Sequence, residues 1–388
     1  MSPLTELLDR HHRAGALPGA VALVADGDDV EVAVVGALAF DGAPMTRDSI
    51  FRVASVTKPI TAAAVLTLVD DGTLTLDDPV ATWLPELASP MVVRTPDAPV
   101  DDVVPARRPI TVRNLLEFRG GHGFSADFAL PAVAALFSEL RQGPPAPQEA
   151  APPDEWMRVL ATIPLLHQPG AAWLYNTGAD ILGVLVGRAA GAPFDDVLAE
   201  RILRPLGMRD TGFHVPADRL DRFTTYYRPD PDGSGLVLAD PPQGQWSTRP
   251  AFPSGAGGLV STVDDLQAFQ HIHLTGGVAG DGRRQLTTAS VALMTSDHLT
   301  AEQRAASSLF LEGQGWGFGG SVDVEQVDPW NVRGRYGWVG GSGTAAHVIP
   351  ATAGVTILLT QVEMTSPAPP AIMREFWAHA ATRARALG

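Results

Sequence analysis

The sequence predicts an α/β protein in which both ends of the chain build a sheet and the middle forms a mostly helical inserted region. β-rich runs lie near the N-terminus and again near the C-terminus, and most of the residues between them follow a helical pattern. We expect residues 1–73 and 250–388 to form the sheet region and residues 74–249 to form the insertion.

The first sheet elements are expected to form a hairpin. Residues 18–36 contain two β-rich runs, and the sequence Asp-Gly-Asp-Asp between them is a strong turn signal. Residues 60–70 are then apolar on nearly every side until Asp71 and Gly72 end the pattern. A helix that is apolar all round belongs in the interior of a protein.

The pattern in the middle of the chain predicts helices joined by loops. Proline density in residues 143–153 forbids regular structure, and we expect a surface loop there. Strand patterns return in residues 343–349 and 354–360, before an amphipathic helix over about residues 369–385. The late strands are therefore expected to join the N-terminal hairpin in one sheet.

Composition excludes several classes of function. The net charge of −15 argues against a nucleic-acid partner, which requires clustered Lys and Arg. A chain of 388 residues without cysteine has no disulfide, no thiolate nucleophile and no Cys-based metal site. His271 and His273 lie near two aspartates, but no further ligand cluster accompanies them, so we predict no metal and no other cofactor.

The expected location is the cytoplasm. The N-terminus mixes acidic and polar residues where a signal peptide would have a basic start and an apolar run. The most apolar stretches are shorter than the roughly 20 residues that cross a bilayer, so no membrane contact is expected. The sequence leaves the oligomeric state open.

Ser55 and Lys58 form the first candidate for chemistry. At this spacing on a helix, the hydroxyl and the amine lie on one face about one turn apart. Serine needs a base to become a good nucleophile, and a lysine can serve when burial lowers its pKa from about 10.4. The apolar helix that follows would supply this burial.

The alternative is structural: Ser55 would cap the helix and Lys58 would be a solvated charge in its first turn. Lys58 is the only lysine in the chain, and the other Lys and Arg positions are all arginine. Because a lysine can give up its proton and an arginine cannot, this exception favours the catalytic interpretation.

The segment Phe51–Pro59 contains a Ser-x-x-Lys motif, formed by Ser55 and Lys58. Four further segments match structural parts of one known superfamily: residues 76–80, 110–116, 205–208 and 257–261. With them the chain resembles the serine β-lactamase and penicillin-binding protein superfamily, most of all the family VIII carboxylesterases, which are similar to class C β-lactamases. The resemblance spans roughly residues 15–362. It implies a β-lactamase-like antiparallel sheet flanked by helices, with the active site between the sheet region and the insertion.

The second family element is a tyrosine, and residues 173–183 resemble the esterase version of it. The resemblance makes Tyr175 a candidate base beside Lys58, and the sequence leaves open which of the two takes the serine proton. β-Lactamases usually carry Asn two residues after this tyrosine, whereas this chain has Asn176 next to it and then Thr177. Both residues are expected to contact substrate, and the difference argues against penicillinase activity.

The third family element is Trp338-Val339-Gly340, which is similar to the Trp-x-Gly segment that replaces Lys-Thr-Gly in family VIII esterases. Trp338 and Gly340 are expected to contact the substrate, and the backbone amides of Ser55 and Gly341 to form the oxyanion hole. A tryptophan in place of lysine removes a cation that could pair with a substrate carboxylate. We therefore expect uncharged acyl esters to be the substrates.

His122 and Phe124 lie where family members have an active-site loop, so both are candidates for lining the pocket, although a solvated loop histidine is an equal alternative. The expected activity is that of a carboxylesterase acting on a small-molecule acyl ester through a Ser55 acyl-enzyme. An acyltransferase, a class C-like β-lactamase, a D-amino acid peptidase and a non-catalytic penicillin-binding-like module remain as alternatives.

Overall fold

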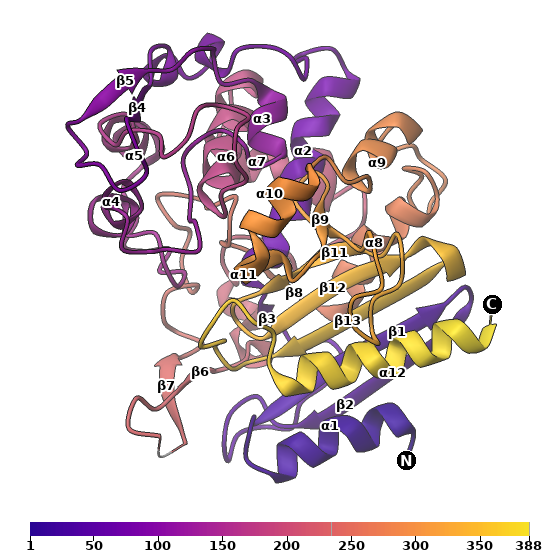
Figure 1. The fold of residues 1–388 in the computed structure, drawn as a ribbon. Helices are drawn as coiled ribbons and strands as arrows, with labels where there is room; N and C mark the ends of the chain where they lie inside the picture. The colour runs from indigo at the N-terminus through magenta and orange to yellow at the C-terminus, as the bar shows by residue number, and fades with distance from the viewer. Residues whose placement is uncertain (234, 388) are drawn as a thin grey trace.

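The computed structural model describes residues 1–233 and 235–387. Within these residues the centre is a seven-stranded antiparallel sheet in the order β2-β1-β13-β12-β11-β10-β9 (Figure 1). Its strands are β1 (Gly19–Asp26), β2 (Asp29–Gly36), β9 (Gly315–Trp316), β10 (Ser321–Val322), β11 (Tyr336–Gly340), β12 (Thr344–Ile349) and β13 (Gly354–Thr360). Strands from both ends of the chain thus pair in one sheet.

Alternation along β1 separates the two faces of this sheet. Ala20, Ala22 and Val24 pack with the terminal helices α1 (Pro3–Arg13) and α12 (Ala371–Leu387), which lie together along one face (Figure 1). Val21 and Leu23 belong to the larger core on the other face, with α2 (Thr57–Asp70) and α8 (Val263–Leu274). Every residue of α2 from Thr57 to Leu68 is buried, as expected for a helix that is apolar all round.

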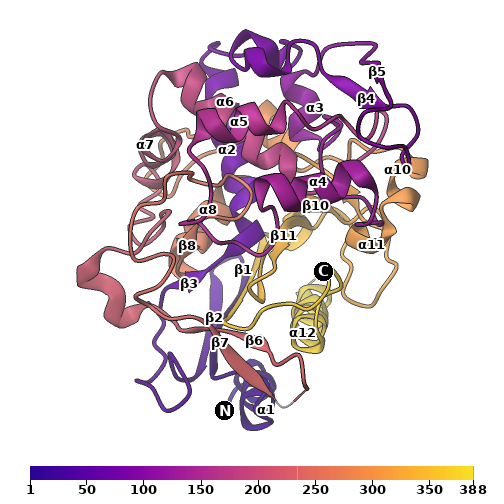
Figure 2. The ribbon, with the colours of Figure 1, turned by 90° about the vertical axis from the view of Figure 1, so that its left-hand side faces the viewer.

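The middle of the chain packs above that second face, and helices make up most of its regular elements (Figure 2). The expected mostly helical insertion is nevertheless wrong in extent, because most residues between 74 and 249 lie in loops and turns. Its α-helices are α3 (Val112–Leu116), α4 (Pro131–Leu140), α5 (Pro153–Leu160), α6 (Thr177–Ala190) and α7 (Phe194–Leu198). Two small antiparallel sheets also lie there, β4 (Met91–Val93) with β5 (Val103–Pro105) and β6 (Tyr226–Pro229) with β7 (Leu236–Asp240).

Shorter elements complete the fold. The two-stranded sheet of β3 (Phe51–Arg52) and β8 (Val260–Ser261) lies just before α2 and α8, and the helices α9 (Thr288–Met294), α10 (Ala301–Ala306) and α11 (Ser308–Leu311) precede β9. Single turns of 3₁₀ helix are η1 (Ala54–Val56), η2 (Val80–Thr82), η3 (Pro85–Leu87) and η6 (Pro350–Thr352); η4 (Ala199–Leu203) is a π-helical turn and η5 (Ala217–Arg222) a longer 3₁₀ stretch.

The predicted α/β fold class is confirmed, and so is the N-terminal hairpin, whose register runs from Gly19 opposite Gly36 to Asp26 opposite Asp29. The helix predicted at residues 60–70 begins earlier, at Thr57. The small sheets of the insertion were not predicted, because strands of three to five residues carry too little alternation to be recognised. The boundaries at residues 73 and 250 remain predictions.

None of the helices described in the structure has the length and apolar character needed to span a membrane. The cytoplasmic location remains a prediction from the sequence.

A buried ion pair joins the segment before Ser55 to the insertion. The Arg52 guanidinium on β3 donates to the Asp240 carboxylate at the end of β7 and, at 2.6 Å, to the backbone carbonyl of Thr224. Arg52 is only 3% exposed, and its guanidinium also lies 4.0 Å from the centre of the Phe223 ring. The pair therefore fixes β3 against the insertion.

We expect Arg52→Met to lower the free energy of unfolding by about 3–5 kcal/mol, because it leaves the Asp240 carboxylate buried without its partner. The matched control is Arg47→Met, which breaks the exposed Arg47–Asp264 pair and should cost about 1 kcal/mol or less. Urea unfolding followed by circular dichroism measures both. Equal effects of the two substitutions would contradict the structural role given to Arg52.

Candidate active site

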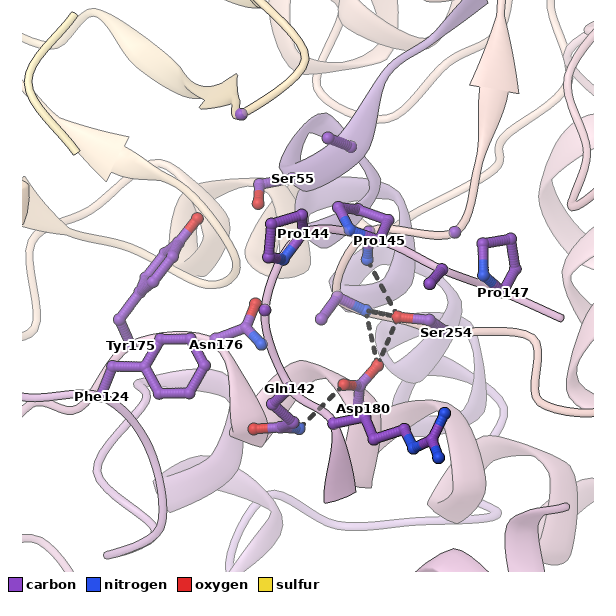
Figure 3. Close-up of a pocket in the computed structure, with 18 of the residues that line it drawn as sticks. Ser55, Phe124, Gln142, Pro144, Pro145, Pro147, Tyr175, Asn176, Asp180 and Ser254 are labelled. Atoms are coloured by element: carbon purple, nitrogen blue, oxygen red, sulfur yellow. Dashed lines mark hydrogen bonds between the residues drawn. The ribbon is translucent and has the colours of Figure 1, made fainter. Parts of the chain in front are cut away.

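Ser55 lies in the 3₁₀ turn η1, where β3 passes into the buried helix α2. The preceding residue, Ala54, has a φ of 42°, a left-handed conformation that costs a residue with a Cβ about 1–2 kcal/mol. This sharp turn leaves Ser55 partly exposed on the wall of a cavity of about 290 Å³ (Figure 3). Strain of this kind is typical of functional sites.

Lys58 is buried directly behind Ser55, with only 1% of its surface exposed. Its Nζ lies 2.8 Å from Ser55 Oγ, 2.9 Å from Asn176 Oδ1 and 2.6 Å from the carbonyl oxygen of Ala256. The amide and backbone oxygens can only accept hydrogen bonds, whereas the serine hydroxyl can donate or accept. With two amine hydrogens taken by the two carbonyl-type oxygens, a neutral Lys58 directs its lone pair at Ser55.

Burial separates the proton affinities of the two candidate bases. Desolvation lowers the pKa of Lys58 to about 7, against an opposing attraction from Asp180. Desolvation raises the pKa of Tyr175 to about 12, although hydrogen bonds with Ser55 and Trp338 act in the other direction. At neutral pH, Lys58 is therefore the group that loses a proton easily, and Tyr175 keeps its own.

Tyr175 is held beside this pair by both backbone and side-chain contacts. Its backbone N–H and C=O both pair with Phe124, at 2.9 and 2.8 Å. The indole N–H of Trp338 donates to the Tyr175 hydroxyl at 2.8 Å, and Lys58 Nζ lies 4.7 Å from the centre of the tyrosine ring. Strand β11 and the insertion thus meet at the tyrosine hydroxyl.

Asn176 has an unusual backbone. Its φ of 77° and ψ of −71° define a γ-turn, in which the N–H of Thr177 bonds the carbonyl of Tyr175 at 3.1 Å. This conformation is strained for a residue with a side chain, and it precedes the first turn of α6. It directs the Tyr175 hydroxyl towards Ser55 (Figure 3). It also places the Asn176 amide oxygen on the Lys58 amine.

Asp180 is a buried carboxylate behind the site. It accepts hydrogen bonds from Ser254 Oγ at 2.6 Å, from the Ala256 backbone at 3.0 Å and from Gln142 Nε2 at 3.1 Å (Figure 3). Burial raises its pKa, and these three donors favour the ionised form. Because Ala256 also presents its carbonyl to Lys58, Asp180 positions one of the two oxygens that hold the amine.

Asp180 lies within the tyrosine motif of residues 173–183, but the sequence assigned it no role, and it did not point to Gln142, Ser254 or Ala256. No local signal marks these three residues. The aspartate five residues after the tyrosine was the one available pointer, since a position near the start of a buried helix places its carboxylate inside the protein.

The proline-rich segment between α4 and α5 is irregular, as predicted, but it also lines the cavity. Six of its residues do so: Gly143, Pro144, Pro145, Ala146, Pro147 and Ala150. Gln142 anchors its start to Asp180 and to Thr177 Oγ1. Gln148 anchors it further along, through three hydrogen bonds of 2.9 Å to Gln245 and Thr248. The segment is a fixed apolar wall, because proline and these anchors restrict its backbone.

The end of β11 lies against the turn that carries Ser55. A Cβ atom on Gly340 would stand 2.3 Å from the carbonyl oxygen of Val53, so only glycine permits this close approach. Gly341 lines the cavity, and a Cβ there would meet no atom within 4 Å. Gly340 thus brings the strand close to the turn, and Gly341 is the residue that faces the cavity.

Three of the expected substrate contacts lie elsewhere. Gly340 packs against Val53, and Thr177 is fully buried with its hydroxyl bonded to Gln142. His122 is buried, bonds the carbonyl of Ile163 at 2.8 Å and lines a separate cavity beside Pro164. The ring of His122 turns inward because that hydrogen bond compensates for its burial. The prediction that His122 lines the active-site cavity is therefore wrong. Phe124, Asn176, Trp338 and Gly341 do line the cavity with Ser55 and Tyr175.

Within residues 1–233 and 235–387, no group of three or more His, Cys, Asp and Glu side chains could hold a metal ion. His273 is buried in the core, where desolvation lowers its pKa to about 4.

Comparison with known proteins identifies the family of the chain. The sequence profile of the Beta-lactamase family matches residues 4–380. The chain belongs to the beta-lactamase family. Protein Rv1367c of Mycobacterium tuberculosis is 39% identical over 90% of this chain and 86% of that protein. Esterase EstB of Burkholderia gladioli is 33% identical over 81% of this chain and 78% of its own length.

Among solved structures, EstCE1, described as a hydrolase with promiscuous acyltransferase activity, superposes with a TM-score of 0.77. It is 25% identical, and the match covers 97% of both chains. The predicted β-lactamase-like fold is thereby confirmed, and the relatives of this family member include esterases.

The matched pair Gly340 and Gly341 tests the close approach of β11. We expect Gly340→Ala to lower the free energy of unfolding by about 1–3 kcal/mol, because its Cβ must displace the backbone at Val53. Gly341→Ala adds the same group into open space and should change stability by about 0.5 kcal/mol or less. Urea unfolding of both variants measures the difference, and equal stabilities would show that the strand has room to move.

The lowered pKa of Lys58 predicts how Ser55 reactivity depends on pH. Below about pH 7 the protonated amine has no lone pair, so the rate of Ser55 labelling by a neutral fluorophosphonate should rise about tenfold per pH unit and level off above pH 7. Asp180→Asn should move the midpoint to lower pH, because the carboxylate favours the ammonium form.

Mass spectrometry of the labelled peptide gives the rate, and Ser55→Ala is the control for non-specific labelling. A rate that continues to rise far above pH 8 would instead identify a base with a high pKa, such as Tyr175.

Proposed function

We propose that the protein is a serine hydrolase, a carboxylesterase that cleaves neutral acyl esters through an acyl-enzyme on Ser55. The observation that carries the proposal is the environment of Lys58. A buried amine held by Asn176 and Ala256 faces the hydroxyl of Ser55, and its pKa lies near the pH of the cell. A capping serine with a solvated lysine would need none of these contacts.

In the first proposed step, neutral Lys58 takes the proton of Ser55 as its Oγ bonds to the ester carbonyl carbon. The carbonyl π electrons move to oxygen, and the backbone amides of Ser55 and Gly341 would stabilise the oxyanion. Such donors typically contribute about 3–4 kcal/mol each. The carbonyl then re-forms, the bond to the alcohol oxygen breaks, and the alcohol leaves with a proton.

Tyr175 has a role in that proton transfer. Its hydroxyl keeps its proton at neutral pH and is hydrogen-bonded to Ser55, so it can give a proton to the departing alkoxide and recover one from Lys58. Trp338 holds the phenol in place through its indole N–H. Water then attacks the acyl-enzyme by the reverse sequence and releases the acid.

The expected preference for uncharged acyl groups is supported by the wall of the cavity. The proline-rich segment, Phe124, Phe252 and Trp338 present apolar surface to the bound substrate. Trp338 occupies the place of the lysine found in other members of the superfamily and carries no positive charge. A substrate carboxylate would lose its hydration there without a partner.

A second candidate is acyl transfer, in which an alcohol or amine replaces water in the second half of the reaction. The specific observation in its favour is the likeness to EstCE1, whose description includes promiscuous acyltransferase activity. The apolar cavity wall would also retain an alcohol acceptor better than water.

The test is hydrolysis of 4-nitrophenyl esters of short and long fatty acids by the wild-type protein and two variants. Ser55→Ala should lose essentially all activity, and Lys58→Arg should lose at least about 100-fold in kcat, because a guanidinium stays protonated and cannot act as the base. Circular dichroism checks that the variants fold.

Added butanol separates the two candidates, because a transferase makes the butyl ester where a hydrolase makes the free acid. Nitrocefin turnover tests the β-lactamase alternative. Retention of esterase activity in Ser55→Ala, or an unchanged rate in Lys58→Arg, would refute the proposal.

A further inference from the structure

Tyr226 and Glu363 lie at the end of the active-site cavity that is bounded by Gly341. Neither residue takes part in the proposed chemistry. Tyr226 comes from strand β6 of the insertion, and Glu363 follows strand β13. Two distant parts of the chain therefore meet at this end of the cavity.

Backbone hydrogen bonds fix the position of Glu363. Its own N–H bonds the carbonyl of Tyr227 at 2.9 Å, and the N–H of Met364 bonds the carbonyl of Gly341 at 2.7 Å. The residue is thus tied on one side to β6 and on the other to the glycine that faces the cavity. These bonds fix the backbone of Glu363 in the wall of the cavity.

The Tyr226 hydroxyl donates a hydrogen bond to the Glu363 carboxyl, and Tyr226 itself is only 8% exposed. One donor occupies part of the acceptor capacity of a carboxylate, which offers about four lone-pair sites. Glu363 is half-buried and lines the cavity, so its remaining lone pairs are open to a bound molecule. Burial raises the pKa of Glu363, whereas the charge of Arg228 and the Tyr226 hydroxyl act in the other direction, and a bound ammonium would favour the ionised form further.

The other charged side chains that line the cavity already have hydrogen-bond or ion-pair partners. The Asp180 carboxylate accepts three hydrogen bonds from Gln142, Ser254 and Ala256. Arg141 pairs with Glu149 at 3.1 Å, and both side chains are well exposed. Glu363 is therefore the charge that a substrate would meet.

We propose that Glu363, positioned by Tyr226, binds an ammonium group carried by the substrate. The inference rests on the proposed ester hydrolysis and adds a substrate class to it: esters that carry no carboxylate but bear an amine in their alcohol part or their acyl part. An ionic hydrogen bond in a partly desolvated site is stronger than one between neutral groups. The net charge of −15 would further attract such a cation.

The test measures binding without turnover, in a Ser55→Ala background, by isothermal titration calorimetry at pH 7. One ligand pair is 2-(dimethylamino)ethyl butanoate and its uncharged isostere 3-methylbutyl butanoate. A second pair, propyl 4-(dimethylamino)butanoate and propyl 5-methylhexanoate, places the ammonium on the acyl side. We expect the ammonium ester of at least one pair to bind about tenfold more tightly than its isostere.

Glu363→Gln in the same background should abolish this preference, and Tyr226→Phe should reduce it. The matched control is Glu155→Gln, which removes an exposed carboxylate of α5 that does not line the cavity and should leave the preference intact. Equal binding within both pairs, or a preference that survives Glu363→Gln, would overturn the proposal.

Failure of this inference is distinguishable from failure of the proposed function. Binding to the Ser55→Ala protein needs no catalysis, whereas ester hydrolysis by the wild-type protein is measured with 4-nitrophenyl esters that carry no amine. Either result can therefore be positive while the other is negative.

Discussion

The burial of a single lysine is the constraint on which the rest of the site depends. An amine inside a protein is tolerated only when its hydrogens find acceptors and when it can become neutral. Asn176 and Ala256 supply those acceptors from two different parts of the chain. The same two contacts direct the lone pair of the neutral amine at Ser55. The contacts that make burial of Lys58 tolerable are therefore also the ones that would let it activate Ser55.

These acceptors must themselves be held, and this explains two features of the insertion. Asn176 adopts a strained γ-turn, which fixes its amide oxygen on Lys58 and its neighbour Tyr175 beside Ser55. Ala256 is held by a hydrogen bond to Asp180, whose carboxylate also anchors the proline-rich wall through Gln142. The buried Asp180 carboxylate thus connects the environment of the Lys58 amine with the proline-rich wall of the cavity.

The sheet contributes through its close approach to the nucleophile. Gly340 lets the end of β11 reach the backbone at Val53, which brings the Gly341 amide and the Trp338 indole to the cavity. The Met364 amide bonds the carbonyl of Gly341, and Glu363 precedes it in the chain. Gly341, which we propose as an oxyanion donor, and Glu363, which we propose for substrate recognition, are therefore joined through the backbone of Met364.

The sequence by itself determined the features that depend on residues close together in the chain. The hairpin, the wholly apolar helix and the meeting of Ser55 with Lys58 all follow from short-range periodicity, and the structure has each of them. The resemblance of three motifs to a known superfamily added Tyr175, Trp338 and the fold. Local pattern also predicted that residues 143–153 would be irregular.

Only the tertiary structure decided what surrounds the lysine and what lines the cavity. The acceptors of Lys58 lie 118 and 198 positions away in the chain, and no periodicity links such distant residues. The order of the two proton affinities depends on how deeply Lys58 and Tyr175 are buried, which the chain sets only when it folds. For the same reason His122 turned away from the cavity, and the proline-rich segment and Glu363 turned out to line it.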